Sequence, residues 1–313
     1  MSLNNCTFLG LITWHGSINR AGYPFKFNRI HLEDLSFNEV ISRNWKHIQE
    51  SEMAPFMPFR EKLKRLKAVS KEWKKNKKKM DKEELNYIRK ELDSLRVLSD
   101  PNYLSFDKKN MIRKLEKRKN MILLKEEESW RLKSRAIWIK AGDRNTKFFH
   151  KFASARREKN SIWSIRDDQG NILTSQDQIT TEAVRYFQNQ YRRREVIFQD
   201  ALWGVELVPE MFNDAANEDF IKPISEDELL KAMKSFKKDI SPGPDGWPIE
   251  IFLHFFDLFK SDLLRMVDAS QMAGNIHSAT TSTFIALIPK KHRSKSFQDF
   301  RTISLCNIMF KII

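Results

Sequence analysis

The chain carries a turn sequence that decides how its last third folds, Ser241-Pro242-Gly243-Pro244-Asp245-Gly246. Proline fixes one backbone angle, and glycine permits angles that other residues avoid, so this run predicts a rigid turn. Asp245 stands between a proline and a glycine. We therefore expect its side chain to cap the turn rather than to take part in chemistry.

The sequence on either side of this turn predicts helices and then a strand. Ser225 and Glu228 have the spacing of a capping box, which marks the start of a helix before the turn. After the turn, residues 248–267 predict one long amphipathic helix. An apolar run over Phe284–Ile288 predicts a buried strand, which Pro289 ends.

The earlier part of the chain predicts shorter elements. Alternation of apolar and polar residues over Phe25–Ile30 predicts a strand, and a short helix is expected over 35–45. Residues 162–173 predict a hairpin, and 180–191 predict a helix. The adjacent acidic pair within the hairpin, Asp167-Asp168, is interpreted as part of a Gly-Asn turn rather than as a pair of metal ligands.

The positive charge of the chain is concentrated in one segment. Residues 57–160 contain 33 Lys and Arg against 15 Asp and Glu, a balance of +18, whereas the rest has 23 against 26, a balance of −3. Basic side chains displace the counterions condensed on phosphates. The segment therefore predicts RNA and/or DNA as a partner; the alternative is a solvated, lysine-rich helix surface.

The same segment has the apolar period of helices. One stripe runs from Phe59 to Trp73, and a second, over 85–95, would follow a break at Asn76 and an N-cap at Asp81. A further helix is expected from near Asp107. The stripes predict a helical hairpin with its apolar faces together and its basic face outward. The alternative is dimerisation through the same stripes.

Several classes of protein are disfavoured by what the sequence lacks. Cys6 and Cys306 form neither a metal-ligand pattern nor a disulfide framework. The N-terminal apolar run has no basic n-region and no cleavage site, and no stretch reaches the ~18 apolar residues of a membrane span. We expect an intracellular protein, nuclear or cytoplasmic, without a membrane partner, and leave its oligomeric state open.

Three blocks of the sequence resemble the LINE-type (non-LTR) retrotransposon polyprotein of plants, whose order is endonuclease, linker and reverse transcriptase. The first block includes Trp138-Ile139-Lys140-Ala141-Gly142-Asp143 and lies within 130–157. The second spans 224–248 around the turn, and the third spans 283–313. The resemblance covers about residues 24–313 and is weakest before Arg60.

This resemblance implies a mainly α fold with minor β. Its expected parts are a remnant after an endonuclease over 1–56, a basic helical linker over 57–160, a hairpin and connecting segment over 161–223, and the fingers of a reverse transcriptase over 224–313. The fingers would be incomplete and would end before the palm of the right-hand fold.

The resemblance also implies binding residues. Arg301 matches an arginine near the triphosphate of the incoming nucleotide, where a guanidinium suits paired phosphate oxygens. Lys290 and Lys291 match a basic pair expected at the template backbone. Thr302 stands where the family usually has proline, and we expect it to hold Arg301 less rigidly. The linker residues expected at the nucleic-acid backbone are Lys133, Arg135, Arg144, Lys147, Arg156 and Arg157.

The implied parent activity is RNA-directed DNA synthesis in target-primed reverse transcription, with Mg²⁺ as the cofactor of the full-length family. No catalytic residue and no metal ligand is assigned in this sequence, and the chain alone is expected to be inactive. The carboxylates tested for such a role are interpreted as surface residues of helices or loops: Asp257, Asp262, Asp268 and Asp299. The alternative function is a non-enzymatic, basic helical protein that binds nucleic acid or forms a coiled coil. A decayed insertion without a selected role is also open.

Overall fold

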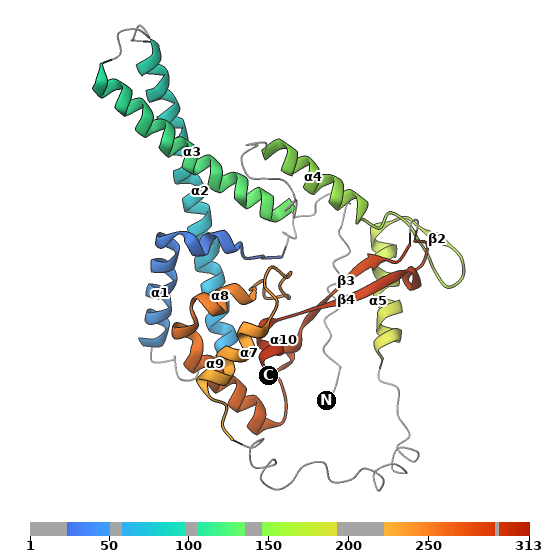
Figure 1. Cartoon of the computed structure of the whole chain (residues 1–313). Helices are drawn as coiled ribbons and strands as arrows, with labels where there is room; N and C mark the ends of the chain where they lie inside the picture. Colours follow the sequence, from blue (N-terminus) through green and yellow to red (C-terminus); the bar gives the residue numbers. More distant parts are fainter. Residues whose placement is uncertain (1–23, 51–57, 98–104, 135–145, 193–221, 292–293) are drawn as a thin grey trace, which may run out of the picture. The chain divides into compact units, whose positions relative to one another are not determined.

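The computed structural model describes residues 24–50, 58–97, 105–134, 146–192, 222–291 and 294–313. These residues are mainly helical and include two short antiparallel strand pairs (Figure 1), which confirms the predicted fold class. The chain divides into two compact units. One is residues 28–160, and the other joins the residues up to Phe27 to residues 161–313.

The 28–160 unit begins with the 3-10 helix η1 (Arg29–Glu33) and the helix α1 (Leu35–Glu50). Helix α1 buries one apolar face against α2 (Phe59–Val97). Aromatic rings join the two helices: the ring centroids of Trp45 and Phe59 are 5.9 Å apart, and those of Phe37 and Trp73 are 4.9 Å apart. The helix predicted near residues 35–45 is confirmed.

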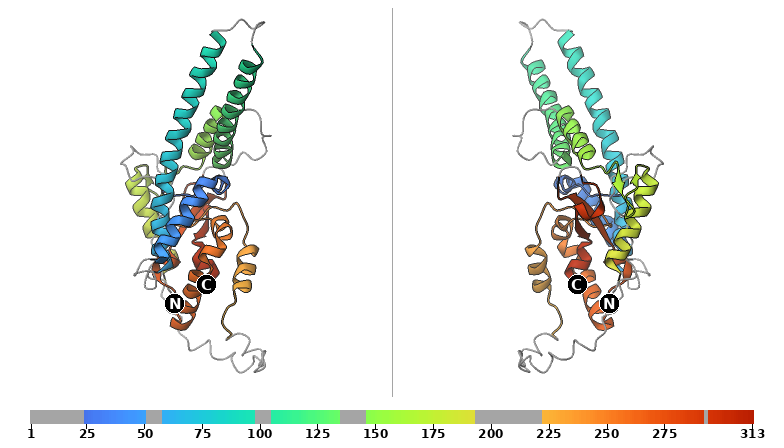
Figure 2. Two further views of the ribbon diagram at one scale, coloured as in Figure 1. Left: turned by 90° about the vertical axis from the view of Figure 1, so that its left-hand side faces the viewer. Right: turned by 90° about the vertical axis from the view of Figure 1, so that its right-hand side faces the viewer.

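Helices α2 and α3 (Phe106–Ser134) form the predicted hairpin, and both views of Figure 2 show them side by side. Leu85, Ile88 and Leu92 of α2 pack with Ile122 of α3 in one buried cluster. The apolar faces are therefore closed against each other within the chain. The connection between the two helices, including the predicted break at residues 100–102, lies outside the described residues.

The predicted break at Asn76 is wrong, since α2 runs unbroken through this position. Asp81 does not cap a helix; it forms an i,i+4 ion pair with Lys77 at 3.7 Å. Lysine and glutamate favour the helical conformation, and the apolar stripe resumes at Leu85. Continuous propensity and packing thus outweigh a capping pattern that occurs inside a helix.

Helix α4 (Thr146–Lys159) completes the unit and packs on α3. The ring centroids of Trp130 and His150 are 3.5 Å apart, and Phe149 is buried. The predicted helix through Phe148, Phe149 and Phe152 is confirmed. The predicted end of the preceding helix, at Gly142-Asp143, lies outside the described residues.

The second unit contains the predicted hairpin of β1 (Ile165–Arg166) and β2 (Ile172–Leu173), followed by α5 (Gln176–Tyr191). One carboxylate oxygen of Asp167 accepts hydrogen bonds from the backbone N–H groups of Gln169 at 2.9 Å and Asn171 at 2.8 Å. Asp168 pairs with Arg185 of α5. The interpretation of Asp167-Asp168 as turn residues is confirmed.

The other helices described in this unit are α7 (Glu226–Ser235), α8 (Ile249–His254), α9 (Phe256–Ala273), α10 (Ser278–Thr281), the 3-10 helix η5 (Phe297–Asp299) and α11 (Ile308–Ile312). The capping box of Ser225 and Glu228 is present at the start of α7. The prediction of one helix over 248–267 is wrong, because the chain bends at Phe255 (φ −106°, ψ 30°). The bend lets Phe252 and Phe259 enter the same core, with ring centroids 6.2 Å apart.

Strands β3 (Thr283–Pro289) and β4 (Phe300–Cys306) pair antiparallel, with Ile288 opposite Arg301. The predicted strand is confirmed, but its predicted burial is wrong: Phe284 is buried, whereas Ile288 is 45% exposed. Two paired strands leave one face in solvent when no further layer covers them.

The strand predicted over Phe25–Ile30 is also wrong. Residues 24–28 form no regular element, and η1 begins at Arg29. The side-chain oxygen of Asn28 accepts a hydrogen bond from the N–H of Ile30, which caps this short helix. The alternation of apolar and polar residues predicted strand pairing here, but the backbone is held by a local helix cap instead.

Candidate nucleic-acid interface

The turn at residues 241–246 is fixed by hydrogen bonds to its backbone. The N–H of Gly246 donates to the carbonyl of Gly243 at 3.0 Å, and the N–H of Phe27 donates to the carbonyl of Gly246 at 3.0 Å. Asp245 Oδ1 accepts from the N–H of Trp247 at 3.0 Å. Asp245 therefore caps the turn.

Both glycines of this turn are required by close approach. A Cβ on Gly243 would lie 2.5 Å from the backbone nitrogen of Asn307, and a Cβ on Gly246 would lie 2.1 Å from the carbonyl oxygen of Phe25. Gly246 also has a positive φ of 81°, which side-chain-bearing residues rarely adopt. The turn is thus in backbone contact with two segments far from it in the sequence.

Asn307 joins the turn to the end of β4. Its side chain is 2% exposed. Its Oδ1 accepts from the N–H of Asp245 at 3.0 Å, and its Nδ2 donates to the carbonyl of Thr280 at 3.3 Å. Sequence reasoning missed this residue, since nothing local marks an asparagine whose partner lies 62 positions away.

Sequence reasoning also missed the aromatic cover of the turn. The rings of Phe25 and Phe27 lie 5.0 Å and 5.4 Å from the ring of Trp247, measured between centroids. A Phe-x-Phe pair and a tryptophan directly after a glycine turn are the available signal. Such a signal is compatible with many other pairings, so it does not by itself predict this contact.

The loop between β3 and β4 uses both predicted template lysines to close itself. Lys290 Nζ donates to the carbonyl of Gln298 at 2.8 Å, and Lys291 Nζ lies 2.7 Å from Asp299 Oδ1. The backbone N–H groups of Lys295 and Ser296 donate to Asp299 Oδ2 at 2.8 Å and 3.2 Å. A phosphate that binds Lys291 must therefore compete with Asp299.

These contacts change the acidity of Asp299. The Lys291 side chain, and then the backbone N–H of Lys295, stabilise the ionised carboxylate and lower the pKa of Asp299 to about 2. Asp299 lies between β3 and β4 as expected, at the end of the 3-10 helix Phe297–Asp299, but it is only partly exposed and its contacts hold the loop together.

Arg301 differs from the two lysines. Its side chain is exposed on β4, opposite Ile288, and it forms no ion pair with any other described residue. Arg301 and Thr302 both lie in the strand ladder, where Arg301 pairs with Ile288 and Thr302 with Leu287. The Tyr191 hydroxyl also donates to Thr302 Oγ1 at 3.1 Å.

A buried cluster anchors the end of the hairpin that carries these basic residues. Phe297 and Phe300 pack with Ile179, Ala183 and Phe187 of α5. The N–H of Arg166 in β1 donates to the carbonyl of Lys295 at 2.7 Å. The structure thus brings Arg301, Lys290 and Lys291 to one anchored end of the β3–β4 hairpin.

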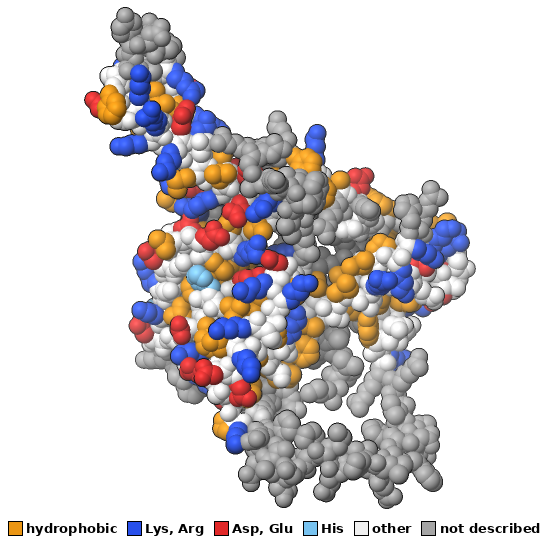
Figure 3. Space-filling model, in the orientation of Figure 1, with side chains coloured by type: hydrophobic (Ala, Val, Ile, Leu, Met, Phe, Trp, Pro, Cys, Tyr) orange, Lys and Arg blue, Asp and Glu red, His pale blue; other side chains and the backbone are white. Residues whose placement is uncertain are grey.

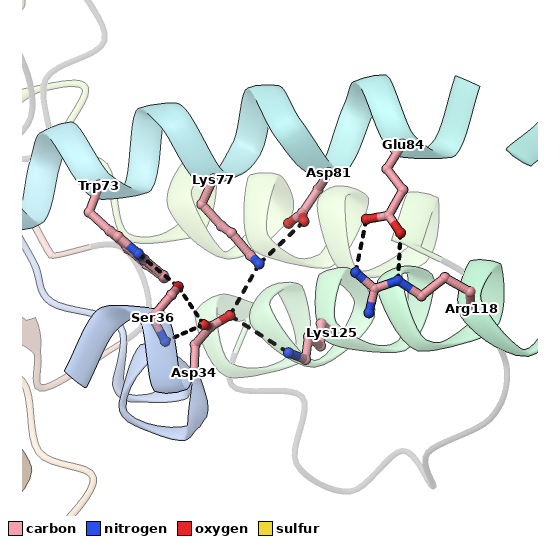
Figure 4. A network of polar contacts seen from close by, with 8 residues as sticks. All are labelled: Asp34, Ser36, Trp73, Lys77, Asp81, Glu84, Arg118 and Lys125. Atoms are coloured by element: carbon pink, nitrogen blue, oxygen red, sulfur yellow. Dashed lines mark hydrogen bonds and ion pairs between the residues drawn. The ribbon is translucent and has the colours of Figure 1, made fainter. Parts of the chain in front are cut away.

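The basic residues of the 28–160 unit include a set with structural roles (Figure 4). The Asp34 carboxylate forms ion pairs with Lys77 of α2 at 3.4 Å and with Lys125 of α3 at 3.7 Å. Arg118 of α3 donates hydrogen bonds of 2.5 Å and 2.9 Å to the carboxylate of Glu84 of α2. Burial tends to raise the pKa of Asp34. Hydrogen bonds from Ser36 and the charges of the two lysines outweigh that effect and lower it.

Other basic side chains of this unit lie on its surface, and Figure 3 shows Lys and Arg along the exposed α2–α3 hairpin. Of the predicted linker residues, Lys133 lies in α3, and Lys147, Arg156 and Arg157 lie in α4. Arg135 and Arg144 lie outside the described residues. The structure places these four in helices but does not describe their side chains.

The helix carboxylates in the second unit include one correction. Asp257 and Asp268 are not buried, but Asp262 is 5% exposed, so its interpretation as a surface residue is wrong. Asp262 Oδ1 accepts from Arg265 at 3.0 Å. Within the described ranges, no group of three or more His, Cys, Asp or Glu side chains is arranged to hold a metal ion.

The described helices include none that is both long and apolar enough to cross a membrane. No protein-family model matches the chain. Over 175 residues, 55% of the chain, the sequence is 27% identical to the Transposon TX1 uncharacterized 149 kDa protein of Xenopus laevis. The match spans 13% of that protein's length. The chain is thus similar to a short part of a transposon protein.

Proposed function

We propose that the chain is part of a LINE-type reverse transcriptase and that its β3–β4 hairpin belongs to the fingers, which bind the template and the incoming nucleotide. The observation that carries this proposal is the position of Arg301. It is exposed on β4, which is hydrogen-bonded to β3, and Lys290 and Lys291 lie at the same end of the hairpin. The similarity to a transposon protein supports it.

The hairpin suits the recognition of a triphosphate. A guanidinium presents paired donors that match two phosphate oxygens, and the pairing of β4 with β3 limits the entropy lost on binding. Lys290 and Lys291 are engaged with Gln298 and Asp299. We therefore assign the principal phosphate contact to Arg301. The two lysines stabilise the loop and make a secondary contact with phosphate.

The proposal is tested by the binding of a labelled deoxynucleoside triphosphate to the full chain in the presence of a primer–template. Arg301→Ala should raise the dissociation constant about tenfold or more, because hydrogen bonds to charged groups contribute about 1.5–3 kcal/mol. Arg301→Lys, which keeps the charge but not the fork, should have an intermediate effect.

The matched control is Arg166→Ala, since Arg166 is also exposed on a strand of the same unit. It should leave the dissociation constant unchanged. Equal affinities of the wild-type chain and Arg301→Ala would contradict the assignment. The proposal also expects the full chain to extend a primer no further than Arg301→Ala does, because no catalytic residue is assigned in this sequence.

A second candidate function is nucleic-acid binding without polymerase activity, and the basic charge of residues 57–160 favours it. The coiled-coil alternative receives no such support. The apolar stripes that would form the coiled coil are buried within the chain, one against α1 and the other against α3.

A further inference from the structure

One side of α2 carries a row of exposed basic residues. We call it the lysine stripe; its members are Lys64, Lys71, Lys75, Lys78, Lys82 and Arg89. Successive members are separated by seven, four, three, four and seven positions. On a continuous helix this spacing places all six on one side, and all six are exposed.

No acidic residue interrupts the stripe. The two other positions on this side between Lys64 and Arg89 are Ala68 and Asn86, both exposed and both neutral. Glu83 lies off this side and pairs with Lys79. The stripe therefore presents an uninterrupted positive surface about 37 Å long, at about 1.5 Å per residue.

The hairpin separates its basic residues into two groups. Lys77, Arg118 and Lys125 form ion pairs that join α2 and α3 to each other and to Asp34, the residue before α1 (Figure 4). By contrast, Lys75, Lys78 and Lys82 form no ion pair with another described residue. Like charges at i,i+3 and i,i+4 destabilise a helix. Repulsion among the charges of the stripe therefore lowers the stability of α2 when no ligand is bound. A bound polyanion would remove this repulsion.

We infer that the lysine stripe binds the sugar–phosphate backbone of a nucleic-acid duplex. Its length corresponds to about one turn of a duplex, about 34–36 Å. Single-strand sites use aromatic side chains on which bases stack. The stripe contains none, since its neutral members are alanine and asparagine. The inference rests on the proposed function, because the duplex assigned to α2 is that of the primer–template.

The test is the binding of the full chain to a fluorescent DNA duplex of about 20 base pairs, about two helical turns, at salt concentrations from about 50 to about 200 mM. The variant Lys75→Gln/Lys78→Gln/Lys82→Gln removes three charges and keeps good helix formers. It should raise the dissociation constant at least about tenfold and reduce the slope of log K against log salt by about 2.7, at about 0.9 per phosphate contact.

Two further variants guard against a trivial result. Lys231→Gln/Lys234→Gln/Lys238→Gln removes three exposed charges from the other unit and should change the slope little. Lys75→Arg/Lys78→Arg/Lys82→Arg keeps the charge and should bind like the wild-type chain. Circular dichroism of the glutamine variant should match that of the wild type, because its three positions are exposed and form no ion pair with a described residue.

Each remaining outcome contradicts the inference. An unchanged slope in the stripe variant, or an equal change in the 231–238 control, would show that the duplex binds elsewhere or responds only to net charge. A single strand of equal length that binds more tightly than the duplex, with the same loss in the stripe variant, would contradict the duplex assignment. None of these results bears on nucleotide binding by Arg301. Conversely, if the stripe variant weakens duplex binding but Arg301→Ala leaves nucleotide binding unchanged, the proposed function is contradicted and the stripe inference stands.

Discussion

The α2–α3 hairpin and the turn at residues 241–246 are stabilised in different ways. Side chains that repeat along two helices hold the hairpin: Leu85, Ile88 and Leu92 pack on Ile122. Backbone atoms of distant segments hold the turn, since Phe27 bonds to Gly246, and the position of a Cβ on Gly243 is occupied by Asn307. The hairpin surface can therefore change with little effect on its fold, whereas a single added methyl group at Gly243 or Gly246 should destabilise the turn.

The largest predicted effect is on the turn. Gly246→Ala should lower its local stability by about 3 kcal/mol, from about 1–2 kcal/mol for a left-handed non-glycine residue and about 1–3 kcal/mol for overpacking against the Phe25 carbonyl. Hydrogen exchange of the Phe27 and Trp247 amides should accelerate about 100-fold. Both amides donate hydrogen bonds at the turn.

A second glycine provides the control for this variant. Gly170 has a similar φ, 87°, but nothing lies within 4 Å of the Cβ that alanine would add. Gly170→Ala should cost only about 1–2 kcal/mol in its own hairpin. Equal losses in the two variants would show that backbone angle, and not contact with Phe25, determines the sensitivity of the turn.

A smaller effect is expected in the hairpin. Arg118→Ala removes the contacts of 2.5 Å and 2.9 Å with Glu84, but both side chains are partly exposed. The free energy of unfolding should fall by about 0.5 kcal/mol, typical of an exposed pair. Adding Glu84→Ala should cost little more, because the pair is already broken. A loss above about 2 kcal/mol would mean that the polar network, rather than the apolar cluster, holds the two helices together.

The sequence predicted the turn and its Asp245 cap, but it predicted the packing partners of the hairpin helices better than those of the turn, for a physical reason. Apolar residues three and four apart mark a helix face wherever they occur, so the partners on α2 and α3 were predictable. The capping pattern at Asp81 and Glu84 failed because it lies inside that repeat. Contacts such as Asp245 with Asn307 depend on two segments meeting in space, and neither segment carries a local mark of the other.

The candidate site shows the same division. The strand was predicted from its apolar run, whereas Lys290, Lys291 and Arg301 were singled out by the resemblance and remain proposed binding residues. The engagement of Lys291 with Asp299 was not, since both are charged loop residues that could equally face solvent. The burial of Asp262 was missed because an isolated aspartate on an amphipathic helix gives no sign of being enclosed.

The smallest predicted effect is a shift in acidity. Lys291→Gln should raise the pKa of Asp299 from about 2 toward the ordinary value of 3.8, because the lysine is the main cause of its lowering. In the wild-type chain the folded-state pKa is below the unfolded one. The ionised carboxylate therefore favours the folded loop above pH 3.8, and this contribution is lost as the pH falls toward about 2.

Carboxyl titration followed by NMR measures this shift, and Lys290→Gln is the control, since Lys290 bonds to the carbonyl of Gln298 instead. A pKa of Asp299 that is the same in the wild-type and Lys291→Gln chains would contradict the loop geometry. It would also mean that Lys291 does not pair with Asp299 and could bind the template directly.

The central claim is that two separate surfaces bind nucleic acid: the lysine stripe on α2 and the hairpin end that carries Arg301. Chemical footprinting of the full chain, with and without a primer–template and a deoxynucleoside triphosphate, tests it most directly. The account predicts reduced modification of Lys75, Lys78 and Lys82 with the duplex, and of Arg301 only when the nucleotide is added. Unchanged modification at these residues, with protection at Lys231–Lys238 or nowhere, would contradict it.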